Sequence, residues 1–287
     1  MLKLAVTVGC AAAMVAAAVL AFRLRHTRRS PSPLSGSEPF GERLAVTVSR
    51  AGGMLVGAYL AGVLAIGAGG RLMMRVLAAT SSDDVQGLQT EADEIIGEVS
   101  FGGSVFLIVG VGIGVAVVGL ALFTMLRRWL PDRSLAAGLV GVAIGAGLLV
   151  RPAGIISSAN SDFTLVAPVV LAVALCLAMF LLFGASFGVL VDDLSGRWPR
   201  PGWSPRGAVS VLPFGMLLPA PPLFVATVIA VLAGTVATRR KSPPARDHPV
   251  RPDVEDVGAR LGRILVMALG VAGSLSILVA AGQVLAL

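Results

Sequence analysis

Long apolar stretches without charged residues alternate along the chain with short segments that carry the charges. Seven stretches contain no Asp, Glu, Lys or Arg, namely residues 4–22, 51–70, 102–126, 134–150, 164–191, 207–238 and 264–287. A helix of a water-soluble domain keeps a polar face, and these stretches have none. About 20 helical residues are needed to cross the hydrocarbon core of a bilayer. The pattern therefore predicts an all-α fold, a polytopic transmembrane helical bundle of about seven apolar segments.

The sixth apolar segment, residues 207–238, contains prolines that a straight helix does not accommodate. This candidate helix break consists of Pro213, Pro219, Pro221 and Pro222. In one arrangement the chain bends at the last three prolines and forms a re-entrant hairpin buried in the bundle. In the other arrangement the segment crosses the membrane once as a kinked helix.

The distribution of Lys and Arg predicts the orientation of the helices, because short basic loops stay in the cytoplasm. The basic segments are residues 23–50, 127–133, 192–206 and 239–263, with six, three, three and seven Lys or Arg. Residues 71–101 and 151–163 carry only two and one. We therefore expect a multi-pass protein of the bacterial cytoplasmic (inner) membrane with its basic segments inside. Segment 239–263 fits this rule only if 207–238 forms the hairpin, so the charges slightly favour that arrangement.

The first apolar stretch, residues 4–22, suits either a cleaved signal peptide or an uncleaved anchor. Lys3 and the small residues near Ala21 suit cleavage, whereas the arginines that follow directly oppose translocation and favour the anchor.

The expected organisation has three parts, namely a signal-anchor helix with a basic flank (1–29), a Pro/Ser/Gly linker (30–50) and the helical bundle (51–287). Within the bundle, residues 76–101 form an acidic extracytoplasmic connection, and residues 239–263 form a basic cytoplasmic loop.

Composition excludes several other classes of protein. Of the 287 residues, 56% are hydrophobic and 14% are charged, which excludes a disordered chain. The two cysteines, Cys10 and Cys176, lie in apolar stretches and do not form a disulfide framework. The net charge of +7 comes from residues that flank apolar runs, a pattern typical of membrane orientation rather than of nucleic-acid binding.

Rows of small residues at every fourth position predict how the helices associate, since helices in lipid attract one another through close backbone approach. The row in the second span consists of Gly53, Gly57, Ala61, Ala65 and Gly69. Further rows are Gly9 to Ala21, Gly110 with Gly114, Ala137 with Gly141 and Gly145, and Ala268 with Ala272, Ser276 and Ala280. We expect packing within the bundle, with a contact to a second copy or another membrane protein as the alternative.

The acidic connection supplies a candidate polar or gating cluster. Its members are Arg71, Arg75, Glu91, Asp93, Glu94 and Glu98. Arg71 and Arg75 lie one helical turn apart and can meet carboxylates on one face. The first interpretation is a surface helix with solvated or paired carboxylates. The alternatives are a lid over a cavity between spans, and a divalent-cation site that uses Asp83, Asp84, Glu91 or Glu94 but lacks any recognised ligand spacing.

Two other polar groups lie near membrane depth. Arg151, Asn160 and Asp162 flank two apolar stretches and are candidate vestibule or helix-cap residues. Residues 184–188 match the GxSxG pattern around Ser186, but the only histidines, His26 and His248, lie in loops. We expect small residues in a long helix rather than a nucleophile. The two His and two Cys are scattered, so we expect no metal and no cofactor.

Three strings, GGRLMMRVLAATS, LQTEADEIIGEVSFGG and SDFTLVAPVVLAVAL, lie within residues 67–191. In them the chain resembles a group of uncharacterised polytopic bacterial integral membrane proteins. The resemblance carries no known activity and implies only that these segments belong to a recurring architecture.

The sequence favours a non-enzymatic integral membrane protein, either an envelope or assembly component or the subunit of a larger complex. Its expected partners are the bilayer, anionic lipid headgroups at the basic loops, and a membrane protein or second copy at the Gly/Ala faces. One alternative is a facilitative transporter or channel built round residues 207–238. The other is a membrane-embedded hydrolase that uses Ser186.

Overall fold

The computed structural model describes residues 2–26, 39–89, 95–98, 100–150, 168–202, 205–217 and 253–286, together with 152, 154, 156, 157 and 160. These residues form helices and turns but no strand, apart from one isolated bridge between Gln89 and Ile95. The all-α prediction is therefore confirmed for the part of the chain that the structure describes.

Five of the described helices are long and apolar enough to cross a membrane. They span Lys3–Arg23, Phe40–Thr80, Phe101–Leu126, Val169–Arg197 and Ala259–Leu285. The fourth predicted stretch forms a shorter apolar helix, Ser134–Leu148, and the sixth is described only as far as residue 217. The five helices indicate a membrane protein, whereas the expected count of seven crossings stays a prediction.

The helices follow one another in a simple order. They are α1 (Leu2–Arg23), α2 (Phe40–Ala61), α3 (Ala68–Thr80), α4 (Phe101–Val105), α5 (Gly112–Leu126), α6 (Ser134–Gly145), α8 (Val169–Arg197), α9 (Pro205–Val209), α10 (Leu212–Gly215) and α12 (Asp253–Leu285). Short π-helical segments continue three of them, namely η1 (Gly62–Gly67), η3 (Phe106–Val111) and η4 (Ala146–Val150), and η2 (Asp83–Val85) is a 3₁₀ turn.

The second span is much longer than its charge-free stretch. Helices α2 and α3 join through η1 into 41 continuous residues, about 60 Å at 1.5 Å per residue, so its ends extend past a bilayer core. Helix α2 begins at Phe40, inside the expected linker 30–50. Similarly, α12 begins at Asp253, so residues 253–263 of the expected basic loop are helical, and 239–252 lie outside the described residues.

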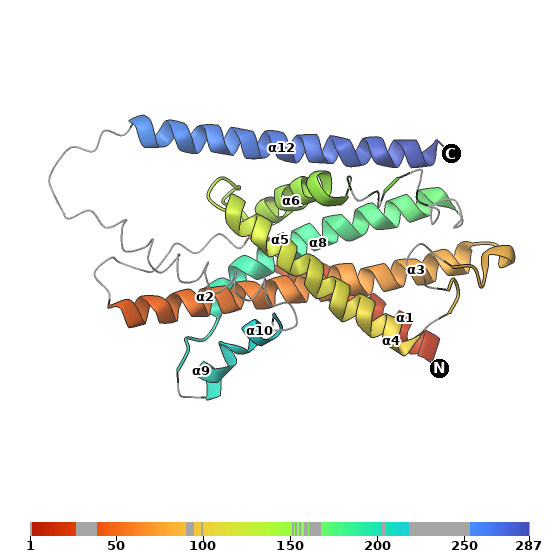
Figure 1. Cartoon of the computed structure of the whole chain (residues 1–287), viewed down its shortest axis with the longest axis horizontal. Helices are drawn as coiled ribbons and strands as arrows, with labels where there is room; N and C mark the ends of the chain where they lie inside the picture. Colours follow the sequence, from red (N-terminus) through yellow and green to blue (C-terminus); the bar gives the residue numbers. More distant parts are fainter. Residues whose placement is uncertain are drawn as a thin grey trace.

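The helix ends that adjoin basic segments gather at one end of the bundle (left in Figure 1). We call this the basic end and define it by residues 40–50, 127–133 and 192–200. The end of α3, the start of α4 and the end of α12 lie at the opposite end (Figure 1). The alternation predicted from the loop charges therefore matches the antiparallel order of the helices.

Glycines bring the backbones of α2 and α8 into direct contact. A Cβ atom on Gly57 would lie 2.6 Å from the carbonyl oxygen of Leu190, and one on Gly53 would overlap the carbonyl of Leu194. Further along the same row, Ala61 and Ala65 are fully buried. The row predicted in the second span therefore serves packing within the chain.

Helix α8 meets α6 in the same way, because a Cβ on Gly188 would lie 2.8 Å from the Cα of Gly138. The π-helical segment η1 also approaches α5 closely, since a Cβ on Gly62 would overlap the carbonyl of Gly112. These contacts confirm that close backbone approach joins the helices of the bundle.

Two predicted rows are not packed along their whole length. In α12, Ala268 and Ala272 are exposed while Ala280 of the same row is fully buried, and the first part of the helix packs through Gly270 and Gly273. In α5, a Cβ on Gly114 would have no heavy atom within 4 Å. In a glycine-rich helix, small residues four positions apart occur on more than one face, and contact with the neighbouring helix determines which face is buried.

We expect Gly57→Ala to lower the free energy of unfolding by about 1–3 kcal/mol, because the added methyl forces α2 away from α8. Denaturant titration of the full chain in detergent micelles measures this change. Gly282→Ala is the matched control, since a Cβ there meets nothing within 4 Å. Equal effects of the two substitutions would contradict the close contact.

Candidate functional site

The structure describes only part of the predicted gating cluster. Arg71 is buried in α3. Arg75 donates a hydrogen bond from Nη1 to the carbonyl of Gly97 at 3.3 Å, whereas Glu98 is exposed. Glu91, Asp93 and Glu94 lie outside the described residues.

The acidic connection holds no recognisable cation site in its described part. Asp83 and Asp84 are exposed in η2. Among the described residues, no three His, Cys, Asp or Glu side chains lie together in a group that could hold a metal ion.

The other candidate residues are only partly placed. The backbone N–H of Asn160 donates to the carbonyl of Ser157 at 3.2 Å. Arg151 and Asp162 lie outside the described residues. Pro213 is buried in α10, and its carbonyl accepts a hydrogen bond of 3.2 Å from the hydroxyl of Tyr59. The remaining prolines of the candidate helix break, Pro219, Pro221 and Pro222, lie outside the described residues.

Ser186 is fully buried and takes part in the hydrogen bonding of its own helix. Its Oγ donates to the carbonyl of Leu182 at 2.7 Å. The glycines on either side, Gly184 and Gly188, form the contact between α8 and Gly138 of α6. Helix packing therefore accounts for the GxSxG spacing.

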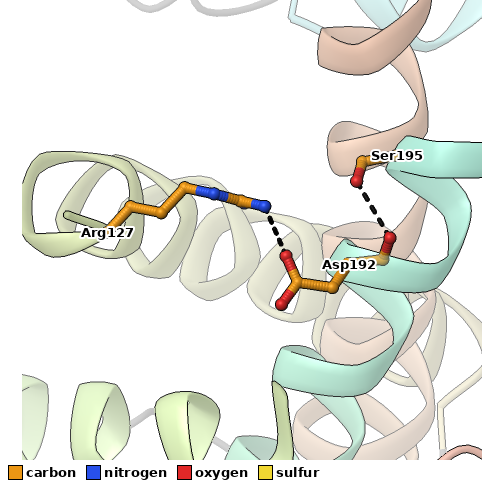
Figure 2. A network of polar contacts seen from close by, with 3 residues as sticks. All are labelled: Arg127, Asp192 and Ser195. Carbon is orange, nitrogen blue, oxygen red and sulfur yellow. Dashed lines mark hydrogen bonds and ion pairs between the residues drawn. The ribbon is translucent and has the colours of Figure 1, made fainter. Parts of the chain in front are cut away.

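A buried ion pair at the basic end is the most distinctive polar feature among the described residues. Arg127, just after α5, places Nη2 2.5 Å from Oδ1 of Asp192 in α8 (Figure 2). The side chain of Asp192 is fully buried, and that of Arg127 is 25% exposed. Each carboxylate or guanidinium loses hydration on burial, so such a pair depends on both partners.

A second arginine contributes to this site from another helix. Arg50 of α2 lies close enough to Arg127 and Asp192 for electrostatic repulsion from the first and attraction to the second. Among the described residues, Oδ2 of Asp192 accepts no hydrogen bond, so the carboxylate depends on these positive charges. Arg43, which is also buried in α2, adds another guanidinium at this end.

Hydrogen bonds to the backbone tie the end of α8 to its neighbours. The hydroxyl of Ser195 donates to the carbonyl of Asp192 at 2.9 Å (Figure 2). Ser49 of α2 donates to the carbonyl of Trp198 at 2.7 Å, and the indole of Trp198 donates to the carbonyl of Ser210 at 3.3 Å. These bonds hold α2, α8 and the segment after α9 in one arrangement around the ion pair.

The ion pair lies next to two phenylalanine rings that contact each other. The guanidinium of Arg127 lies over the ring of Phe123, 5.6 Å from its centroid. Phe123 meets Phe187 edge-on, with ring centroids 5.5 Å apart. Both rings line an apolar cavity of about 600 Å³ between η1, α5, α6 and α8.

A second apolar cavity, of about 520 Å³, lies between α6, α8 and α12. Its wall includes Leu139, Phe180, Val271 and Ile277. Neither cavity is lined by described residues of α9 or α10.

Sequence reasoning treated Arg127 and Asp192 only as flanking charges that orient the helices. Asp192 directly follows the charge-free stretch 164–191, and an acid at that position of a predicted span was the available signal. Its partner lies 65 residues away in the sequence, so only the packing of α5 against α8 identifies it.

Comparison of the chain with protein-family models, curated proteins and solved structures finds no match. The interpretation of the candidate site therefore depends on its geometry alone.

We expect Asp192→Asn to lower the free energy of unfolding by about 2 kcal/mol, because two arginines lose their shared counter-charge. The cost stays below that of a fully enclosed pair, since Arg127 is partly exposed to solvent. Denaturant titration in micelles provides the measurement. Replacing both partners, Arg127→Gln with Asp192→Asn, should recover part of the loss.

Glu42→Gln is the control, because Glu42 and Arg200 form an ion pair at the same end in which both side chains are largely exposed. Its effect should stay within about 0.5 kcal/mol. If Asp192→Asn lowers the free energy of unfolding no more than this control does, the ion pair between Arg127 and Asp192 does not stabilise the fold as we describe.

Proposed function

We propose that this chain is a non-enzymatic integral membrane protein that serves as an assembly component of the bacterial cytoplasmic membrane or as a subunit of a larger complex. The observation that supports the proposal is that polar side chains in the described bundle connect helices to one another. The Arg127–Asp192 pair joins α5 to α8, and Tyr59 joins α2 to α10. Ser186 bonds within its own helix. Such contacts position helices and leave none of these groups poised for chemistry.

The outer face of α12 supports an association role. One side of this helix packs on α6 through Val266, Gly270 and Gly273. The opposite side presents large exposed apolar side chains, including Leu261, Ile264 and Leu265. In a membrane, this face meets either lipid or another membrane protein.

Photo-crosslinking in living cells tests the proposal. A photoreactive amino acid replaces single exposed residues on this outer face of α12, at positions 261, 265, 268 and 272. We expect protein adducts at positions that recur every three or four residues, because one helix face would meet the partner. A photoreactive residue at the buried position 266 is the control and should give no adduct with another protein.

Lipid adducts alone at every exposed position would contradict the association role. Glycerol flux through reconstituted vesicles, abolished by Tyr59→Phe, would also contradict it. That second result would favour the facilitative transporter built round residues 207–238, whose described beginning is broken into the short helices α9 and α10.

A further inference from the structure

The second and third of the five long helices each contain a π-helical segment, η1 in the second and η3 in the third. At the end of η1, the amide of Ala68 donates to the carbonyl of Val63. At the end of η3, the amide of Gly112 donates to the carbonyl of Leu107. Both bonds reach back five residues instead of four, so each segment holds one residue more than a regular α-helical turn.

Glycines at the two ends of η1 bring it directly against the third long helix. A Cβ on Gly62 would overlap the carbonyl oxygen of Gly112, and one on Gly67 would overlap that of Ile108 in η3. In a regular α-helix, residues five positions apart point about 140° away from each other. Gly62 and Gly67 nevertheless face the same neighbour, so this double contact requires the π-helical bonds of η1.

The hydrogen bonding of the backbone is divided where the two segments meet. The amide of Gly112 is shared between the carbonyl of Leu107, five residues back, and that of Val109, three residues back. The amide of Gly62, at the start of η1, is also shared between two carbonyls. A shared amide can exchange one acceptor for the other without losing its only bond. The helix pitch at these two positions is therefore less fixed than in a regular α-helix.

The contacts of the second long helix differ on the two sides of η1. Before it, Gly53 and Gly57 bring the backbone of α2 against the backbone of α8. After it, a Cβ on Gly69 of α3 would lie 2.9 Å from Sδ of Met14 and 3.2 Å from Cγ of Met179. Methionine side chains adapt to small displacements, whereas touching backbones do not. Helix α2 is therefore held more firmly against α8 than α3 is.

The described part of the acidic connection is bound to α3. Nη1 of Arg75 donates to the carbonyl of Gly97 at 3.3 Å, and Nε2 of Gln86 donates to the carbonyl of Ala78 at 2.7 Å. A displacement of α3 would therefore carry these parts of the connection with it.

We propose that η1 and η3 together form a hinge, at which α3, α4 and the acidic connection move relative to α2 and α8. Exchange of π-helical for α-helical bonds changes the direction in which each helix leaves its π-helical segment. Ile66 of η1 and Val111 of η3 line the cavity between η1, α5, α6 and α8, so the movement changes the shape of that cavity. The hinge goes beyond the proposed assembly role, since it needs no protein partner.

Pulsed electron–electron double resonance on the full chain in micelles measures this movement. Cys10 and Cys176 are first replaced by alanine, and nitroxide labels are attached to Ala79→Cys in α3 and Leu181→Cys in α8, both at exposed positions. We expect two distance populations for this pair. The control pair combines Leu181→Cys with Gly41→Cys at the start of α2, where a Cβ meets nothing within 4 Å. It should give one narrow population, because α2 is held by backbone contacts.

Deletion of Leu64, within η1, tests whether the extra residue makes the hinge. Gly62 and Gly67 would then lie four residues apart in a regular α-helix and would still face the third long helix. We expect the second distance population between positions 79 and 181 to be lost. Leu64→Ala is the matched control, since it shortens the same side chain but keeps the extra residue, and it should retain both populations.

Equal widths of the distance distributions for the two label pairs would overturn the proposal. So would two populations that persist after deletion of Leu64, or the loss of one of them in Leu64→Ala. Circular dichroism checks that each variant is folded. If the deletion of Leu64 prevents folding, deletion of Leu107 in η3 decides in its place, and the comparison of the two label pairs needs no deletion.

Discussion

The interior of a bilayer offers no hydrogen-bond partner, and the described architecture follows from that constraint. Polar backbone must be satisfied within helices, so the chain forms long continuous ones, including the 41 residues from Phe40 to Thr80. Hydrophobic exclusion does not hold such helices together in lipid. Their attraction comes from close contact, which Gly57 and Gly188 supply by letting backbones touch.

The same constraint explains where the charged groups lie. Burial of Asp192 is tolerated because Arg127 lies at bonding distance and Arg50 adds a second positive charge. Asp192 lies near the end of α8 (Val169–Arg197) rather than in its middle. Glycine has two distinct roles around it. At Gly138 it allows helices to meet, and at Gly114 it leaves the cavity that adjoins the ion pair.

The sequence alone predicted the helices and their alternation, because both depend on local hydrophobicity and charge. It also identified the packed row through Gly53, since the second span has one dominant small face. The start of α2 at Phe40 was not predicted, because Arg43 and Arg50 look like loop charges until a neighbouring helix buries or balances them. The partner of Asp192 and the buried face of α12 depend on which helices become neighbours, and a single sequence does not contain that information.

Chemical labelling of the two ends of the bundle tests the central claim, that they face opposite sides of a membrane. Cys10 and Cys176 are first replaced by alanine, and a single cysteine then substitutes for the exposed Asp84 or Gly202. The account predicts that a membrane-impermeant maleimide labels Asp84→Cys on intact cells and Gly202→Cys only after the cells are opened. Labelling of both from the same side would contradict it.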